Sequence, residues 1–309
     1  DHNTYVGFAS GDAHTTADSN TGVGSFSLSE NTTGTNNTAV GRGALFTNTT
    51  TDDNTAVGYR ALYASVGASN TALGSDCLKT NTTGANNTAV GKSAMDATTT
   101  GSENTAIGRS AMDANTTGAS NVAVGRSALA ANTTGARNIA IGHDAYVASD
   151  TESDNIAIGY AALTTNTAGG TRNVAIGNYA GDALTSADDC TFVGNSAGSV
   201  HTTGSKGTFI GANAGIENTT GTGNTYLGYQ AGKSNTTGSN NVAVGVDSGF
   251  YSQGRPITGS ENTFLGARTN SGVEAQANQI CIGFEGRPSQ SGDTSTAHFH
   301  HGSGTYSKI

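Results

Sequence analysis

A glycine that returns with a 17-residue period constrains this sequence more than any other feature. It closes the motif Asn-Thr-Ala-Val-Gly, which occurs unchanged at residues 37–41, 54–58 and 87–91. The closing glycine recurs 17 times between Gly7 and Gly283, and 13 of the 16 gaps equal this period. A fixed period of this kind is typical of repeat architectures, in which each repeat is one structural unit stacked on the next.

Within the repeat, we number the motif Asn as position 1 and the closing glycine as position 5. Position 2 is Thr, Val or Ile and position 4 is aliphatic in every copy, a pattern that predicts a short strand. Position 8 is small, and positions 12–15 usually read Asn-Thr-Thr-Gly, which favours a turn. We therefore predict an all-β, parallel β-solenoid (β-roll) of about 17 coils, with two short strands and two turns per coil. Stacked position-1 asparagines would form a hydrogen-bonded ladder.

Positions 3 and 9 compensate each other in volume. Where position 3 is Ala, position 9 is usually large, as in Ala39 with Leu45. Where position 3 is aromatic, position 9 is usually Gly, as in Phe209 with Gly215. Because interiors are close-packed, volume at one site excludes volume at its neighbour. We therefore expect the two positions to fill the same space.

The predicted strand is uncharged on both faces. Positions 2 and 4 point to one side and position 3 to the other, and no copy has a charged residue at any of them. One coil can enclose only one interior, so the second face should be covered by another chain. The repeat therefore predicts a homo-oligomeric fibre.

Composition excludes several classes of function. The net charge of −9 is spread along 309 residues and leaves no basic patch, which argues against nucleic acid as a partner. No run of 18 apolar residues exists, so no membrane span is expected. The chain begins at Asp1, part-way into a repeat and without a leader pattern, so we expect a processed start. Its three cysteines are expected to be buried free thiols, because they lie in repeats too far apart to pair.

The motifs Asn-Thr-Ala-Val-Gly and Asn-Ile-Ala-Ile-Gly, the latter at 138–142 and 155–159, resemble the head repeats of trimeric autotransporter adhesins. The longer pattern, with Ala-Leu and Asn-Thr-Thr-Gly, is similar to repeats of phage tail-fibre proteins. The resemblance covers residues 1–283 and implies a homotrimer that presents a binding tip. In the tail-fibre family, a self-cleaving chaperone domain often follows such repeats.

On this resemblance we expect a viral tail-fibre segment for host-cell attachment, located on a virion or an extracellular appendage. Its partners would be two further copies of the chain and a cell-surface glycan or protein receptor. A structural extracellular filament or matrix fibre is the alternative. Ice binding would need a flat array of threonines at position 2, and it is disfavoured because this row is interrupted by Val122, Ile139, Ile156 and Val174. No enzyme is expected: the acidic pairs Asp52-Asp53 and Asp188-Asp189, which a polysaccharide depolymerase could use, sit in predicted turns.

The repeat divides the chain into a β-solenoid shaft, residues 1–283, and an irregular cap, tip or connector, residues 284–309. The longest gap between closing glycines, from Gly245 to Gly266, contains a segment with Phe250, Tyr251 and Arg255. These aromatic and basic residues make it a candidate receptor-binding loop, although a solvated insertion is the favoured explanation of the segment.

One histidine cluster, at residues 298–301, is a candidate metal site. In an extended strand His298 and His300 point to the same side. Three chains in register would bring six imidazoles together, which suits an octahedral transition-metal ion of the iron or nickel type. Some phage tail-fibre tips are similar, with His-x-His strands that bind metal on the trimer axis. The alternative is a polar tail that happens to contain histidines.

Overall fold

The computed structural model describes residues 2–166, 169–249, 257–270, 275 and 277–285, together with the backbone of strands 297–301 and 305–308. Across these residues all regular structure is β-strand, and no helix forms. The chain divides into two compact units, residues 1–154 and 155–309. The predicted fold class, a parallel β-solenoid with a 17-residue repeat, is confirmed.

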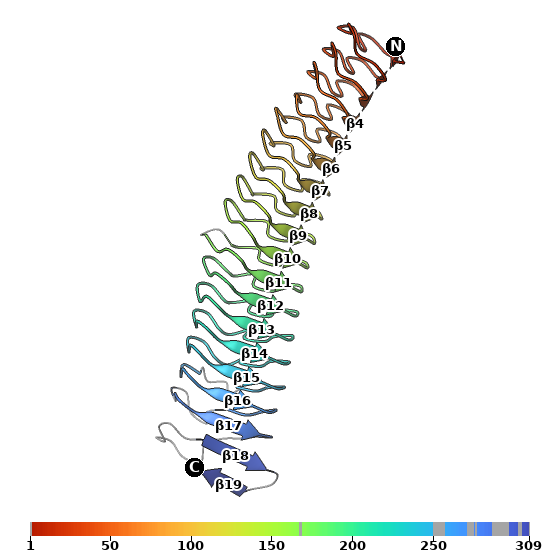
Figure 1. Ribbon diagram of the computed structural model, residues 1–309. Helices are drawn as coiled ribbons and strands as arrows, with labels where there is room; N and C mark the ends of the chain where they lie inside the picture. The colour runs from red at the N-terminus through yellow and green to blue at the C-terminus, as the bar shows by residue number, and fades with distance from the viewer. Residues whose placement is uncertain are drawn as a thin grey trace. The chain divides into compact units, whose positions relative to one another are not determined.

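The first unit stacks one three-residue strand per coil over its described residues (Figure 1). Each strand pairs in parallel with the next, and every repeat position faces its own counterpart, as Thr38 faces Thr55. In order the strands are β1 (Thr4–Val6), β2 (Thr21–Val23), β3 (Thr38–Val40), β4 (Thr55–Val57), β5 (Thr71–Leu73), β6 (Thr88–Val90), β7 (Thr105–Ile107), β8 (Val122–Val124) and β9 (Ile139–Ile141).

The second unit continues the same in-register parallel pairing from β10 to β17. β18 adds to β17 in parallel, and β19 then returns antiparallel to β18. The strands are β10 (Ile156–Ile158), β11 (Val174–Ile176), β12 (Thr191–Val193), β13 (Thr208–Ile210), β14 (Thr225–Leu227), β15 (Val242–Val244), β16 (Thr263–Leu265), β17 (Ile280–Gly283), β18 (Ala297–His301) and β19 (Thr305–Lys308).

Each regular coil contains one strand rather than the two that we predicted from the repeat. Positions 7 and 9 adopt positive φ, for example 55° at Ser93 and 54° at Met95, so the segment between them turns. A third positive φ precedes the motif, as at Asn86 with 60°. Residues in the left-handed region cannot continue an extended strand. The prediction of a second strand is therefore wrong.

The glycine at position 5 is required by both backbone conformation and space. Gly125 has a φ of 138°, which L-residues with a side chain rarely adopt. A Cβ on Gly125 would lie only 2.3 Å from the carbonyl oxygen of Gly142 in the next coil. Because the coils stack directly, the same two constraints return in each coil and fix the period of the sequence.

In each unit, the apolar side chains of the interior come mainly from positions 3, 8 and 9. Ala39, Ala44 and Leu45 are fully buried in one coil of the first unit. In the second unit Phe209 takes position 3, and a Cβ on Gly215 at position 9 would lie 2.7 Å from its ring. The predicted sharing of one volume by positions 3 and 9 is confirmed.

The position-1 asparagines form the predicted ladder, which joins the backbones of adjacent coils. Asn104 Oδ1 accepts a hydrogen bond of 2.9 Å from the backbone N–H of Asn121. Asn104 Nδ2 donates to the carbonyl of Gly118, also at 2.9 Å. Where Cys190 replaces the asparagine, its thiol lies 3.3 Å from the carbonyl of Gly204, the same repeat position as Gly118. The ladder thus satisfies backbone groups that the turn would otherwise bury unpaired.

The three cysteines are free and buried, as the sequence predicted. Burial raises the pKa of the Cys77 thiol to about 12 and that of Cys190 to about 11. Burial likewise raises the pKa of Cys281 to about 12. The thiols therefore stay protonated at neutral pH, and they pack as small apolar side chains of the repeat.

Candidate functional site

The outer surface of the strands is an uncharged face that we call the strand face, formed by the side chains at positions 2 and 4. Position 3 points inward, as at the fully buried Ala72, while its neighbour Leu73 is 48% exposed. Ile107 in the first unit and Leu227 in the second are 41% and 46% exposed. Contiguous exposed apolar side chains of this kind mark interaction surfaces.

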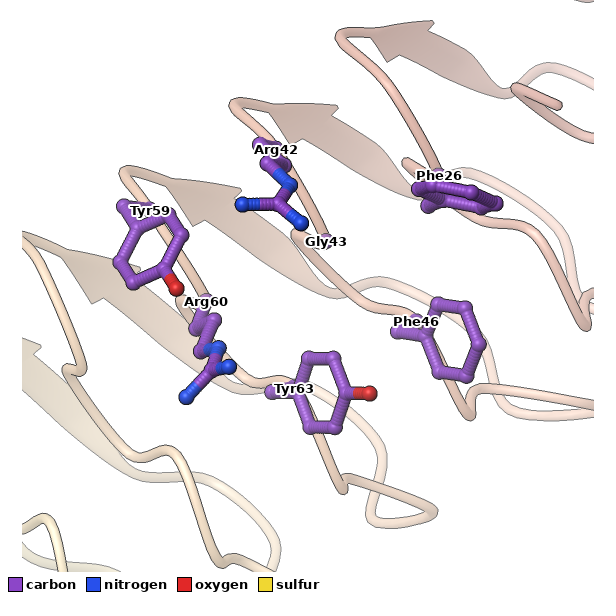
Figure 2. Close-up of a pocket in the computed structure, with 7 residues that line it drawn as sticks. All are labelled: Phe26, Arg42, Gly43, Phe46, Tyr59, Arg60 and Tyr63. Atoms are coloured by element: carbon purple, nitrogen blue, oxygen red, sulfur yellow. The ribbon is translucent and has the colours of Figure 1, made fainter. Parts of the chain in front are cut away.

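A second candidate lies in the first unit, where a cavity of about 250 Å³ opens between adjacent coils. We call it the aromatic–arginine groove (Figure 2). Seven residues line it: Phe26, Arg42, Gly43, Phe46, Tyr59, Arg60 and Tyr63. In the view of Figure 2, Gly43 is central, with Arg42, Tyr59 and Arg60 to its left, Phe26 and Phe46 to its right, and Tyr63 below it between Arg60 and Phe46.

Aromatic rings from successive coils form one wall of the groove. The rings of Phe46 and Tyr63 are stacked, with centroids 5.0 Å apart and planes 6° apart. The ring of Phe26 meets Phe46 edge-on at 6.3 Å, and Phe8 meets Phe26 edge-on at 5.3 Å. Offset-stacked and edge-to-face contacts are the favourable geometries for aromatic pairs. The result is a partly exposed apolar surface that spans several coils.

Two arginines supply the positive charge of the groove. The Arg60 guanidinium lies 5.1 Å from the Tyr59 ring centroid and 5.7 Å from that of Tyr63. Within the described part of the chain, no carboxylate oxygen lies within 4 Å of Arg42 or Arg60. This contrasts with Arg137 on the same unit, which pairs with Asp154 at 2.6 Å. Both groove arginines can therefore bind an anion without giving up an ion pair.

The groove exists because of one small residue at position 7. Phe26 and Arg60 occupy this position in the flanking coils with φ of 62° and 52°, and Gly43 has a φ of 66°. With no side chain at Gly43, a hollow remains between the side chains on either side. We did not predict this site from the sequence, because positions 6, 7 and 10 vary from coil to coil. The available signal was that aromatic residues gather there in the first four repeats.

The predicted receptor-binding loop residues, Phe250, Tyr251 and Arg255, lie outside the described residues. Ile257, just after them, is buried and pairs with Asn235 through a parallel bridge. His298 and His300 lie in β18, whose backbone is extended as we expected, but its side chains are outside the described part. Among the side chains that are described, no group of three or more His, Cys, Asp or Glu could hold a metal ion.

The two acidic pairs that we weighed as catalytic have structural contacts with the adjacent coil. Asp52 Oδ1 accepts hydrogen bonds from the backbone N–H and the hydroxyl of Thr35, at 2.7 and 3.0 Å. Asp188 makes the same two contacts with Thr171, at 2.7 and 2.8 Å. Asp189 forms an ion pair with Arg172, whose hydrogen bond lowers the pKa of that carboxyl. These side chains cap turns of the repeat.

No family model matches the sequence, and no curated protein matches it significantly. In the part of the chain that the structure describes, no helix is long and apolar enough to cross a membrane. The function is therefore inferred from the two surfaces described above, the strand face and the aromatic–arginine groove.

Proposed function

We propose that this chain is a segment of a structural fibre for attachment to host cells, of the viral tail-fibre type, assembled as a homotrimer. The observation that carries the proposal is the strand face. In coil after coil it presents a β-branched residue beside an aliphatic one that is partly exposed, as at Leu73 with 48%.

The physical reason is the cost of leaving this surface in water. Apolar surface contributes roughly 25 cal/mol per Å² when it is removed from solvent. Because the strand face repeats in register along each unit, a second copy of the chain presents a matching surface at the same spacing. Closed rotational symmetry, as in a trimer, lets every copy cover its strand face.

Sedimentation of the native protein tests the assembly directly. We expect a mass of about 92 kDa, three times the 30.7 kDa of one chain. Leu73→Lys combined with Ile107→Lys should convert the trimer to monomers or unfold it, because both substitutions put charge into the proposed interface.

A matched control places the same charges elsewhere on neighbouring turns of the first unit. Thr83→Lys combined with Thr100→Lys changes two exposed residues away from the strand face, and this variant should keep the mass of the wild type. A stable, folded monomer of the wild-type chain would contradict the homotrimer.

Host attachment is tested by binding of the purified protein to intact cells and to glycans released from their surface. A receptor-binding fibre should bind saturably and compete with particles that carry the same protein. Assembly into filaments without saturable binding would instead support the alternative, a purely structural extracellular fibre.

A further inference from the structure

We propose that the aromatic–arginine groove binds an acidic saccharide, a sugar ring that carries a carboxylate or a sulfate group. The proposal rests on the proposed function, since it names the class of receptor that the fibre would attach to. The site itself lies within the first unit of one chain.

The aromatic wall fits the apolar face of a sugar ring. Phe46 and Tyr63 stand 5.0 Å apart in the stacked arrangement, and both are partly exposed. Beside them Tyr59 is 40% exposed. A sugar ring exposes C–H groups on one face, and burying these against an aromatic surface removes apolar area from water.

The arginines select for negative charge. A guanidinium presents several donors in a fixed plane that matches carboxylate and sulfate oxygens. No described carboxylate lies within 4 Å of Arg42 or Arg60, in a chain whose net charge is −9. Arg60 is also held against Tyr59 and Tyr63, which limits the freedom that it would lose on binding. Charge complementarity therefore favours an anionic occupant.

The size of the groove favours a short saccharide. Its volume of about 250 Å³ is below that of a typical pocket for a drug-sized ligand. A Cβ on Gly43 would already lie 3.3 Å from the ring of Tyr63. Any larger side chain at Gly43 would therefore enter the space that a ligand needs.

The test measures binding of three tetrasaccharide probes to the full chain by calorimetry. Tetragalacturonate carries carboxylates, a carrageenan tetrasaccharide carries sulfates, and cellotetraose is neutral. We expect at least one acidic probe to bind, with an affinity that falls as salt is added. Which acidic probe binds distinguishes the carboxylate from the sulfate, and equal binding of cellotetraose would overturn the acidic class.

Two variants act on the groove in different ways. Arg42→Gln with Arg60→Gln removes the charge and should weaken binding by about tenfold or more. Gly43→Phe keeps the other six lining residues but fills the hollow, and should abolish binding. The backbone of Gly43 suits this change, because Phe26 occupies position 7 with nearly the same φ, 62° against 66°.

The control is Tyr179→Ala in the second unit, which removes an exposed aromatic residue at the same repeat position as Gly43. Tyr179 pairs edge-on with Tyr160 at 5.3 Å, and its removal should leave binding unchanged.

Phe46→Ala separates ligand binding from structural stacking. If this variant melts at a lower temperature yet binds as the wild type does, the aromatic wall serves only the fold and the proposal is wrong.

Sedimentation of the same samples keeps the two proposals apart. A trimer that binds no acidic probe overturns the groove proposal and leaves the fibre standing. A monomer that binds an acidic probe supports the groove and contradicts the trimer. If the groove variants change the mass of the assembly instead of the affinity, the groove is a contact between copies and the saccharide proposal fails.

Discussion

Individual residues carry unusual backbone conformations in this repeat. Buried leucines and methionines at position 9 sit in the left-handed region, as Leu45 does at 50° and Met112 at 52°. This conformation costs a residue with a side chain roughly 1–2 kcal/mol. The coil tolerates it because the turn brings each of these side chains into the closed interior, where its burial offsets the cost.

At the residue scale, the shared volume of positions 3 and 9 can be tested in the second unit. Phe209 stacks on Tyr226 at 4.8 Å and meets Phe192 at 5.3 Å, so Phe209→Ala should destabilise by about 3–5 kcal/mol per subunit. Gly215→Leu should recover part of this loss in the double variant. Leucine tolerates the φ of 59° there, because Leu45 has 50° at the same repeat position.

Denaturant unfolding of the wild type, the two single variants and the double variant measures the coupling energy between positions 209 and 215. Recovery should be incomplete, because a Cβ on Gly215 also approaches Tyr226 to 3.0 Å. In the wild-type background Gly215→Leu should be strongly destabilising, since the Phe209 ring fills the space. Strict additivity of the two substitutions would show that the positions do not share packing.

A second prediction at this scale concerns pH. His201 is fully buried, with Nδ1 2.9 Å from Asn218 Oδ1 and Nε2 hydrogen-bonded to the carbonyl of Gly204. Desolvation lowers its pKa below the usual 6.5, despite these hydrogen bonds. The unfolded chain therefore binds the proton more readily than the folded chain does. Stability is fully present above pH 6.5 and falls as the pH drops from there towards the lowered pKa.

His201→Asn supplies the matched variant, because asparagine occupies the same repeat position at Asn31 and Asn218. Melting temperatures between pH 8 and pH 5 should fall less steeply for the variant than for the wild type. For one proton, the pH dependence of the free energy of unfolding can differ between the two proteins by up to about 1.4 kcal/mol per pH unit. Parallel curves for the two proteins would show that His201 does not titrate on unfolding.

At the element scale, one coil is held to the next mainly by backbone hydrogen bonds and by the asparagine ladder. Backbone bonds link adjacent coils beyond the strands as well, for example from Leu45 N–H to the carbonyl of Ala61 at 3.0 Å. The ladder adds side-chain bonds at the corner just before each strand, where Asn104 is 1% exposed. Each coil therefore depends on its neighbours for paired polar groups, as expected of a solenoid.

Asn104→Ala tests the ladder. It leaves the backbone N–H of Asn121 without its acceptor, whereas the carbonyl of Gly118 loses one of two bonds and keeps that from Asn115 Nδ2 at 3.0 Å. An unpaired buried group costs about 1–3 kcal/mol, so we expect a loss of about 1–3 kcal/mol in the free energy of unfolding. Asn195→Ala is the control: this exposed asparagine lies outside the ladder, and its loss should change stability by less than about 0.5 kcal/mol. Equal losses in both variants would contradict the role of the ladder.

At the scale of the whole molecule, the metal site at His298 and His300 stays a prediction. It requires three copies of β18 around one axis, so it depends on the proposed trimer. Elemental analysis of purified trimer should find about one iron- or nickel-type ion per three chains, as six imidazole ligands would give. His298→Ala and His300→Ala should each lose the metal, and His301→Ala should keep it. Metal-free wild-type protein, with thermal stability unchanged in the double variant, would rule the site out.

The sequence by itself determined the repeat and its interior. The glycine at position 5, the asparagine at position 1 and the paired volumes of positions 3 and 9 could all be predicted. Each of these residues meets a structural requirement that recurs in every coil, so the same sequence pattern recurs with every coil. The same redundancy makes the uncharged outer side of the strand evident from the order of residues alone.

Only the tertiary structure decided where the coil turns and which exposed residues meet. The sequence gives no sign that Leu45 and Met95 have positive φ, because residues with long apolar side chains rarely adopt it. In the structure this backbone conformation places both side chains in the buried interior. Phe46 and Tyr63 lie one repeat apart in the sequence and occupy a variable position of it. Stacking of coils places these two rings 5.0 Å from each other, and the missing side chain of Gly43 leaves the hollow beside them.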